Sequence, residues 1–392
     1  MNRVRLLLIL LMLALAGCLP FTPPAPLPAT NTPLPATSVP DTPVPPTPNL
    51  PPLGGAVVEH PRLASFHMLN RKDGWGLSDT ALLRTDDGGA TWHDRTPPGA
   101  AAAGFAAQGD YLDAARAALL IPDAGDPLHT GTVFLTLDGG ASWTSHPAPF
   151  GSGQLRFLPG MQNGWAMAGL GVGAGSNAIA IFRTSDGGAN WQQVFTDLPT
   201  DPAASDEIPL GGLKGVFFAL DAERAWVGGV IYSDNTSYLY RTDDGGQHWS
   251  QVELEPPDEA PGQWSVESIQ FASPSIGFLS LRVSAQASSL AVYASQDEGD
   301  SWDLTPASIP DGRAADFVSE TEGFVFDGTD FLSTRDAGQT WERIAPDVVF
   351  SESFMSMDFV DAQTGWVAAL DPTTSEVGFY KTTDGGRTWE LQ

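Results

Sequence analysis

The stretch Lys381-Thr382-Thr383-Asp384-Gly385-Gly386-Arg387-Thr388-Trp389 is the last of seven copies of one pattern, Ser/Thr-x-Asp-x-Gly-x-x-Trp. The tryptophans that end successive copies are 39 to 58 residues apart, a period that suits one four-stranded β-sheet per copy. The seven copies contain the aspartates Asp87, Asp138, Asp186, Asp244, Asp297, Asp336 and Asp384, and the tryptophans Trp92, Trp143, Trp191, Trp249, Trp302, Trp341 and Trp389. Repeats of this length predict a set of similar sheets that bury their faces against one another.

The residue types of the pattern are those of a tight turn between two strands. An aspartate accepts hydrogen bonds from backbone amides that follow it, and a Ser or Thr hydroxyl links the opposite limb of the turn. The glycine shared by all seven copies suits a backbone position with positive φ, where a β-carbon would clash. Because Glu298 and Ala337 stand just before that glycine in two copies, this preceding position is expected to need no special backbone freedom. The aspartates are therefore expected to be structural, not catalytic.

A small residue followed by an aromatic precedes the turn in six copies, and apolar residues alternate before it, as Ile269 and Phe271 do. These pairs are Gly74-Trp75, Gly164-Trp165, Ala225-Trp226, Gly277-Phe278, Gly323-Phe324 and Gly365-Trp366. Such alternation predicts half-buried strands. The second copy departs from the pattern, with an alanine-rich stretch over 113–120. The fold predicted for residues 55–392 is all-β, a seven-bladed β-propeller of four-stranded blades, with 56–59 expected to close the ring on the outer edge of the last blade.

The first residues form a targeting signal. Arg3 and Arg5 precede an apolar run over 6–16 that is too short to span a bilayer stably, and the run ends at Leu15-Ala16-Gly17-Cys18. This ending resembles a bacterial lipobox, which implies that residues 1–17 are a signal peptide and that Cys18 is lipid-modified. A plain secretory signal is the alternative. Residues 18–54 are then the lipidated cysteine and a Pro/Thr-rich, semi-extended tether. We therefore expect an extracytoplasmic protein anchored to a bacterial membrane by its lipid.

Composition excludes several classes of function. Asp and Glu number 47 against 19 Lys and Arg, a net charge of −28 that would repel nucleic acid. Cys18 is the only cysteine, so disulfides and thiolate chemistry are not expected in the mature protein. The six histidines lack ligand spacing, and no phosphate-binding or nucleophile-elbow motif is present. We expect no metal, no cofactor and a monomer.

The repeated turn resembles the Asp box of sialidases, xyloglucan-degrading hydrolases, sortilin-type receptors and photosystem II stability/assembly factors. Gly365-Trp366 followed by the turn at Thr382 is most similar to the photosystem II assembly factors, and the likeness covers nearly all of 56–392. The resemblance implies Asp boxes at the propeller's periphery, between the third and fourth strands of each blade. It also implies a non-enzymatic protein-binding or assembly scaffold, whose partner would be a membrane protein.

A sialidase-like glycoside hydrolase, or a carbohydrate-binding surface lipoprotein, stays open as the alternative. Sialidases resembling this fold carry a Phe/Tyr-Arg-Ile-Pro signature, whereas the nearest phrase here is Phe182-Arg183-Thr184-Ser185, inside the third turn. Xyloglucan hydrolases place two aspartates across a cleft between two propellers, and this chain is long enough for one. A catalytic pair among 47 acidic residues is not excluded by sequence, because its separation is a property of the folded chain.

Candidate partner-binding residues are few. Arg84, Arg183, Arg241 and Lys381 share one position, just before the Ser/Thr of their turns, and form either a positive series for a partner or ordinary solvent-facing strand residues. Trp264 is the one tryptophan that the repeats do not explain; it is either a binding aromatic or the start of an inner strand. Insertions over 169–177, 197–212 and 253–264 are expected to form loops at one end of the central channel, where propellers bind ligands.

Overall fold

The computed structural model describes residues 53–100, 104, 106–257, 262–371, 373–374 and 376–392, all of which fall in one compact unit. The predicted signal peptide, Cys18 and most of the tether therefore lie outside the described residues. No helix in these ranges is long and apolar enough to cross a membrane.

Apart from a short 3-10 helix, η1 (Ser351–Ser353), the regular elements are strands that follow one another in antiparallel groups of four. The first group is β2 (Leu63–Met68), β3 (Gly74–Ser78), β4 (Leu82–Thr85) and β5 (Trp92–Asp94), with β1 (Val57–Val58) added beside β5. Next come β6 (Gln108–Tyr111), β7 (Ala117–Pro122), β8 (Gly131–Thr136) and β9 (Thr144–Ala148), then β10 (Gly153–Phe157), β11 (Gly164–Gly173), β12 (Ser176–Thr184) and β13 (Gln192–Thr196).

The remaining groups repeat this order. They are β14 (Leu213–Ala219), β15 (Ala225–Asp234), β16 (Tyr238–Thr242) and β17 (Ser250–Gln251); β18 (Gln263–Phe271), β19 (Gly277–Ser284), β20 (Ser288–Ser295) and β21 (Asp303–Pro310); β22 (Ala314–Phe317), β23 (Gly323–Phe326), β24 (Phe331–Thr334) and β25 (Glu342–Ile344); and β26 (Phe354–Phe359), β27 (Gly365–Leu370), β28 (Val377–Thr382) and β29 (Glu390–Leu391). Pairing of β15 with β18 joins two of these groups into one eight-stranded sheet.

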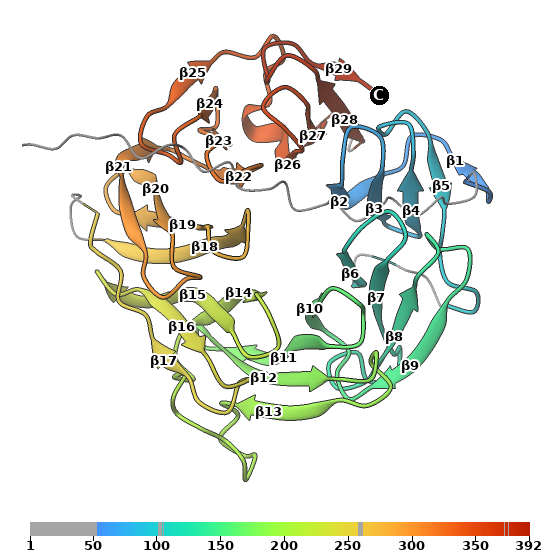
Figure 1. Cartoon of the computed structure of the whole chain (residues 1–392), viewed down its shortest axis with the longest axis vertical. Coiled ribbons are helices and arrows are strands. Elements are labelled where there is room, and N and C mark those ends of the chain that lie inside the picture. Colours follow the sequence, from blue (N-terminus) through green and yellow to red (C-terminus); the bar gives the residue numbers. More distant parts are fainter. Residues whose placement is uncertain (1–52, 101–103, 105, 258–261, 372, 375) are drawn as a thin grey trace, which may run out of the picture. The chain divides into compact units, whose positions relative to one another are not determined.

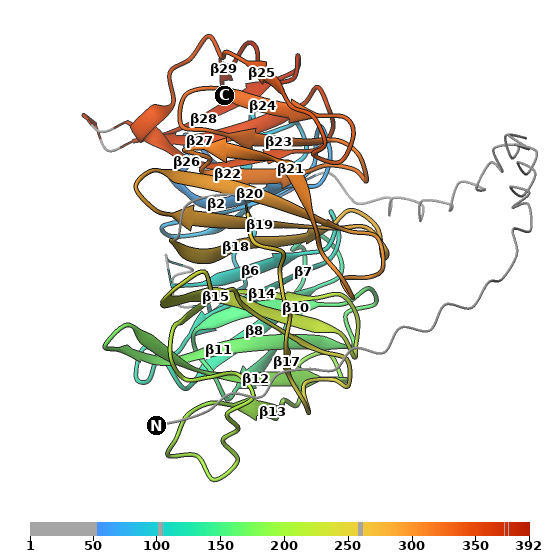
Figure 2. The same cartoon turned by 90° about the vertical axis from the view of Figure 1, so that its left-hand side faces the viewer.

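The groups are arranged around a central opening, with the first strand of each nearest the centre and the fourth outermost (Figure 1). Seen from the side, the sheets lie one behind another like the blades of a propeller (Figure 2). The prediction of an all-β propeller built from four-stranded antiparallel sheets is confirmed.

Neighbouring sheets contact one another through a row of side chains that lie side by side on the first three strands of a sheet. In one such row Asp358 pairs with Trp366 and Trp366 with Lys381; in another, Arg156 pairs with Trp165 and Trp165 with Arg183. We call this arrangement the contact row. Where the row contains a tryptophan, that side chain is fully buried. The indole N–H groups of Trp75, Trp165 and Trp366 donate to the backbone carbonyls of Asp113 (3.0 Å), Asp221 (2.9 Å) and Gly88 (2.9 Å) in the next sheet. Removing a side chain of this size from a core typically costs about 3–5 kcal/mol.

The repeated turn lies between the third and fourth strands of each group, with the same hydrogen bonds each time. In the third group the Thr184 hydroxyl donates to Asp186 (2.9 Å) and accepts from the Gly188 amide (2.9 Å). The same carboxylate oxygen, Oδ1, also accepts the Asn190 backbone amide (2.9 Å), and the other oxygen, Oδ2, accepts the Asn190 side-chain amide (2.7 Å). These bonds, that from the Asn190 side chain first, lower the pKa of Asp186 to about 2.

The position before each tryptophan contributes a donor that the sequence analysis treated as variable. In each of the seven turns its side chain contacts the second oxygen of the aspartate, at 2.6 to 2.7 Å. The residues are Thr91, Ser142, Asn190, His248, Ser301, Thr340 and Thr388. The polar residue at this position in all seven copies was the sequence signal that could have predicted this hydrogen bond.

The expectation that the position before the shared glycine needs no backbone freedom is wrong. Glu298 and Ala337 have φ of 62° and 59°, in the same left-handed region as the glycines of the other copies, for example Gly187 at 70°. A non-glycine residue in this region costs about 1–2 kcal/mol, so these two turns are held in place by their surroundings.

The prediction that 56–59 would add to the last sheet is also wrong. β1 pairs with β5 of its own sheet, Val57 opposite His93 and Val58 opposite Trp92. This pairing follows from proximity along the chain, because β5 has a free outer edge only 30-odd residues downstream. Within the described residues no strand is shared between the first sheet (β1–β5) and the last (β26–β29), a boundary that we call the closure seam.

Side chains that bond or pack across the boundary hold the closure seam together. The Met68 amide donates to Asp358 (2.6 Å), and Arg71 forms an ion pair with Asp361 (2.7 Å). Trp366 and Phe379 of the last sheet enter the apolar cluster of Leu63, Met68, Leu83 and Trp92 in the first. The seam thus uses the same contact row as the other boundaries.

Candidate functional site

The strand order assigns every loop to one of two faces. In an antiparallel four-stranded sheet, the turns after strands one and three lie at one end, and the hairpin after strand two and the connection to the next sheet lie at the other. The Asp-box turns therefore share one face. The predicted insertions follow strand two (169–177) or strand four (197–212 and 253–264), so they lie on the opposite face, which we call the insertion face. In the side view the β11–β12 hairpin projects beyond its neighbours (Figure 2).

A buried ion pair fixes two of these insertions to the propeller. Lys214 and Asp197 lie 2.7 Å apart, with side-chain exposures of 0% and 1%. The Lys214 ammonium also donates to the carbonyls of Asn177 (2.7 Å) and Leu210 (2.8 Å), and Asp197 accepts the Ile179 amide (2.7 Å). Burial lowers the pKa of Lys214, and hydrogen bonding to Asp197 opposes that shift. These bonds to backbone groups hold the two insertions in place.

The four cations predicted from the turn position do not form a surface series. Each lies over the strand-two tryptophan of its own contact row, with ring distances from 4.7 Å for Arg183 on Trp165 to 5.7 Å for Arg84 on Trp75; Arg241 (5.5 Å) and Lys381 (5.1 Å) fall between. Arg84 is only 3% exposed, so the solvent-facing interpretation is wrong for it.

Two of these cations also reach the next sheet. Arg183 donates to the carbonyl of Gly245 (3.3 Å) and Arg241 to that of Gly299 (3.2 Å), both in Asp-box turns. The structure therefore places them as contacts between sheets, where cation–π attraction and a charge-assisted hydrogen bond act together.

Trp264 is the second residue of β18, as the alternative interpretation expected, and it is buried at 5% exposure in a core cluster with Trp226 and Leu281. It is not part of any exposed surface. The signal that could have settled this is the alternation of Trp264, Val266 and Ile269 with polar residues along one strand.

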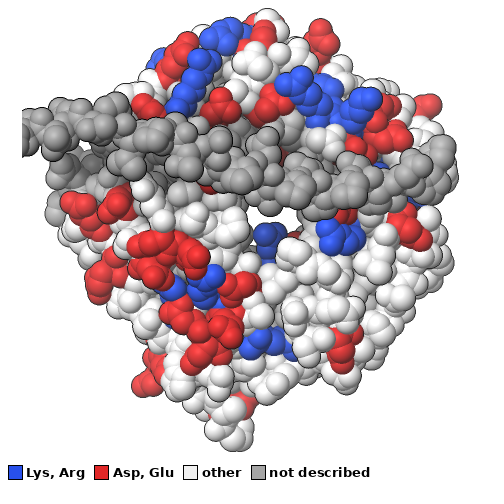
Figure 3. Space-filling view, in the orientation of Figure 1, with Lys and Arg blue, Asp and Glu red and all other residues white. Residues whose placement is uncertain are grey.

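The inner ends of the contact rows meet beside the central channel. They are the penultimate residues of the innermost strands: His67, Asp110, Arg156, Phe218, Gln270, Asp316 and Asp358. We call this set the channel ring. Figure 3 shows the opening at the middle of one face, with Lys or Arg atoms visible inside it. Sequence reasoning missed the ring, although each member lies eight or nine positions before its cross-strand partner.

The three carboxylates of the channel ring are bonded to the backbone of the following sheet. Asp110 accepts the amide of Phe157, Asp316 that of Phe359, and Asp358 that of Met68, each at 2.6 Å. Gln270 does the same for Phe317 at 3.1 Å. One oxygen of each carboxylate is thus occupied in joining two sheets.

Burial and neighbouring charges shift the pKa values of three residues of the channel ring. Burial, and then the charge of Asp358, raises the pKa of Asp316 to about 7, so its carboxyl is partly protonated at neutral pH. Burial also raises the pKa of Asp110, against the charge of Arg156. Burial disfavours charge on His67, but its 3.1 Å contact with Asp358 outweighs this and raises its pKa above the usual value.

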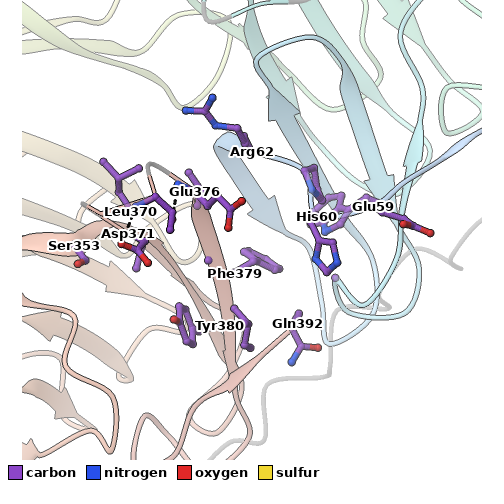
Figure 4. A pocket seen from close by; sticks show the side chains of 18 of the residues that line it. Glu59, His60, Arg62, Ser353, Leu370, Asp371, Glu376, Phe379, Tyr380 and Gln392 are labelled. Carbon is purple, nitrogen blue, oxygen red and sulfur yellow. Dashed lines mark hydrogen bonds between the residues drawn. The ribbon is translucent and has the colours of Figure 1, made fainter.

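A second candidate site is a groove of about 910 Å³ along the closure seam. Its walls are 57–62 with the β4–β5 turn on one side, and 348–353, the β27–β28 hairpin and the end of β29 on the other. In Figure 4, His60 and Glu59 extend from the first sheet, opposite Phe379, Tyr380 and Glu376 of the last. We call it the closure groove. Pockets of roughly 300–1,000 Å³ are typical of ligand sites.

Among the described residues, no group of three or more His, Cys, Asp or Glu side chains could hold a metal ion. The absence of a metal site stays a prediction.

Comparison with known proteins gives the fold but no family. No family model matches the chain. A curated xyloglucanase of Hypocrea jecorina (strain QM6a) is 26% identical over 246 residues, which is 54% of this chain and 28% of the enzyme. The chain therefore spans less than a third of that relative.

Solved structures that match are propellers of differing function. The GH74 xyloglucanase from Xanthomonas campestris has a TM-score of 0.57 and 14% identity over 86% of this chain and 55% of that one. An ulvan lyase of family PL25 has a TM-score of 0.50 and 11% identity, covering 86% and 95%. YCF48 bound to a D1 peptide has a TM-score of 0.49 and 16% identity, covering 84% and 94%. At these identities the likeness shows the fold alone.

The position of Arg241 predicts a role in stability. Arg241→Gln removes the contact over Trp226 and the bond to Gly299, and should lower the free energy of unfolding by about 1–3 kcal/mol. Arg335→Gln is the matched control, because Arg335 occupies an Asp-box turn but is exposed. Urea unfolding followed by tryptophan fluorescence measures both. Equal midpoints for the two variants would contradict the assignment.

Proposed function

We propose that this chain is a non-enzymatic binding protein: a seven-bladed Asp-box propeller held outside the cytoplasm by a lipid on Cys18, which recruits a protein partner through its insertion face and closure groove. The observation that carries the proposal is the state of the channel carboxylates, each of which has an oxygen bonded to the backbone of a neighbouring sheet. The resemblance of the Gly-Trp and Asp-box phrases to photosystem II assembly factors supports a binding role.

The chemistry of glycoside hydrolysis explains why those bonds matter. Hydrolysis needs one neutral and one ionised carboxyl, both free to reach the bond that is cut. The pKa of Asp316, raised to about 7 by burial and the charge of Asp358, would suit the neutral member of such a pair. Their hydrogen bonds to Phe359 and Met68, however, direct an oxygen of each towards the backbone. We infer that the raised pKa of Asp316 reflects its burial at a sheet boundary next to Asp358, and not a catalytic role.

A glycoside hydrolase is the second candidate, and the 26% identity to a xyloglucanase favours it modestly. The match covers 28% of that enzyme, so the activity of the whole enzyme does not transfer to this chain on sequence grounds. The raised pKa of Asp316 makes it the residue that would serve as general acid.

An activity screen separates the two candidates. The mature protein, incubated with xyloglucan, sialosides and ulvan, should release no more reducing sugar or unsaturated uronate than Asp316→Asn does. Asp371→Asn, at an exposed position, controls for general effects of losing a carboxylate. Turnover by the wild-type protein that disappears in Asp316→Asn and persists in Asp371→Asn would refute the binding proposal.

Membrane attachment has its own test. Expressed in a bacterial host, the wild-type chain should incorporate labelled fatty acid and partition into the detergent phase of Triton X-114. Cys18→Ser should lose the label and move to the aqueous phase, because the thiol is the only attachment point for the lipid. If both proteins partition alike and neither is labelled, Cys18 is not the anchor.

A further inference from the structure

The closure groove concentrates exposed apolar surface. The described residues expose ten large apolar side chains, and four of them line this groove: Val57 (53%), Val349 (83%), Leu370 (37%) and Leu391 (65%). Single exposed apolar residues are ordinary on a soluble protein, whereas several that border one cavity mark an interaction site. Exposed apolar side chains are therefore concentrated at the groove, where an apolar partner could pack against them.

The polar residues of the groove are mostly acidic. Glu59, Asp371 and Glu376 line it against one guanidinium, that of Arg62, and the imidazole of His60. Neither Glu59 nor Glu376 forms an ion pair with any residue that the structure describes, whereas Asp110 and Asp358 of the contact rows pair with Arg156 and His67. With a net charge of −28 on the whole chain, the groove attracts cationic groups.

The edges of the groove are strand edges. β1 is the outermost strand of the first sheet and β29 of the last, so each has one side without a hydrogen-bonded neighbour strand. Val57 belongs to β1 and Leu391 to β29, and both line the cavity. Free backbone groups at a strand edge can bind an extended polypeptide.

We propose that the closure groove binds an extended polypeptide segment of a partner protein, one that alternates apolar side chains with Lys or Arg. The apolar side chains pack on Val349, Leu370 and Leu391, and the cations pair with Glu59 and Glu376. This site rests on the binding function proposed above and gives the chemistry of its partner.

Two other occupants fit the groove less well. A polysaccharide packs its rings on exposed aromatic faces. Phe379 is 6% exposed and its ring contacts Trp92 and Phe66. Tyr380 is half-buried, with its ring packed edge-to-face against Phe350. An anionic membrane surface would be repelled by the three carboxylates. A basic, apolar peptide is the occupant that matches both the surface and its charge.

The test uses a fluorescent synthetic peptide of alternating Leu and Lys, titrated with the mature chain by fluorescence polarisation. Two matched peptides replace Lys by Glu or Leu by Ser. Val349→Asp should weaken binding at least tenfold, about 1.4 kcal/mol, and Glu376→Lys should weaken it severalfold. The controls are Leu137→Asp, which is 64% exposed outside the groove, and Glu320→Lys, another exposed carboxylate; both should stay within twofold of wild type. Circular dichroism melting of all four variants checks that they fold.

The outcomes are separable. Binding that is lost only in the groove variants, and only with the Lys-containing peptide, supports the site. Absence of saturable binding, equal loss in the control variants, or equal binding of the Glu-containing peptide would overturn it. A natural protein partner that binds wild-type and groove variants alike would remove this site and leave the binding function intact, whereas turnover in the activity screen would remove the function itself.

Discussion

Every boundary in this propeller depends on a row of side chains that one sheet presents to the next. The row begins with a channel-ring residue and continues through a buried apolar side chain on the second strand. In four of the seven sheets this side chain is a tryptophan with a cation over its ring, as in Asp358, Trp366 and Lys381. In the other three sheets the third position is Leu135, Ala294 or Ser333. A four-stranded sheet cannot bury both of its faces alone, so this contact supplies the burial that each sheet lacks. Hydrogen bonds fix how the two sheets are oriented at this contact: the Met68 amide donates to Asp358, and the Trp366 indole donates to the Gly88 carbonyl.

The periodic features of this fold were predictable, and those that depend on the folded ring were not. Seven Asp-box turns and the small-aromatic pairs were enough to predict four-stranded sheets and a propeller, because each is a local pattern repeated many times. The pairing of β1 with β5 was missed because either free edge was compatible with the sequence. Arg84 was expected either in a positive series for a partner or facing solvent. It is instead only 3% exposed over Trp75 of its own sheet, a burial that the pattern of a single strand does not reveal.

The candidate sites likewise include features that were predictable from local sequence and features that depend on the folded ring. The insertions were located from their lengths, whereas the channel ring and closure groove join residues nearly 300 positions apart, such as His67 and Asp358. The carboxylates of the ring are bonded to neighbouring sheets, and the burial that this position imposes on Asp316 beside Asp358 accounts for its raised pKa without catalysis. The groove lies along the closure seam, where the first and last sheets meet. The proposed binding site therefore depends on how the first and last sheets of the propeller meet.

Amide hydrogen exchange at residue resolution tests most directly whether the closure seam differs from the other boundaries between sheets. Met68, Phe157 and Phe359 each donate a backbone N–H to a channel carboxylate at 2.6 Å, but only Met68 does so across the closure seam. The other two boundaries are also spanned by the covalent chain, so the seam should open first. The account predicts that the Met68 amide exchanges at least about tenfold faster than those of Phe157 and Phe359. Equal protection of all three would show that the ring opens as one unit and that the seam is not its weakest boundary.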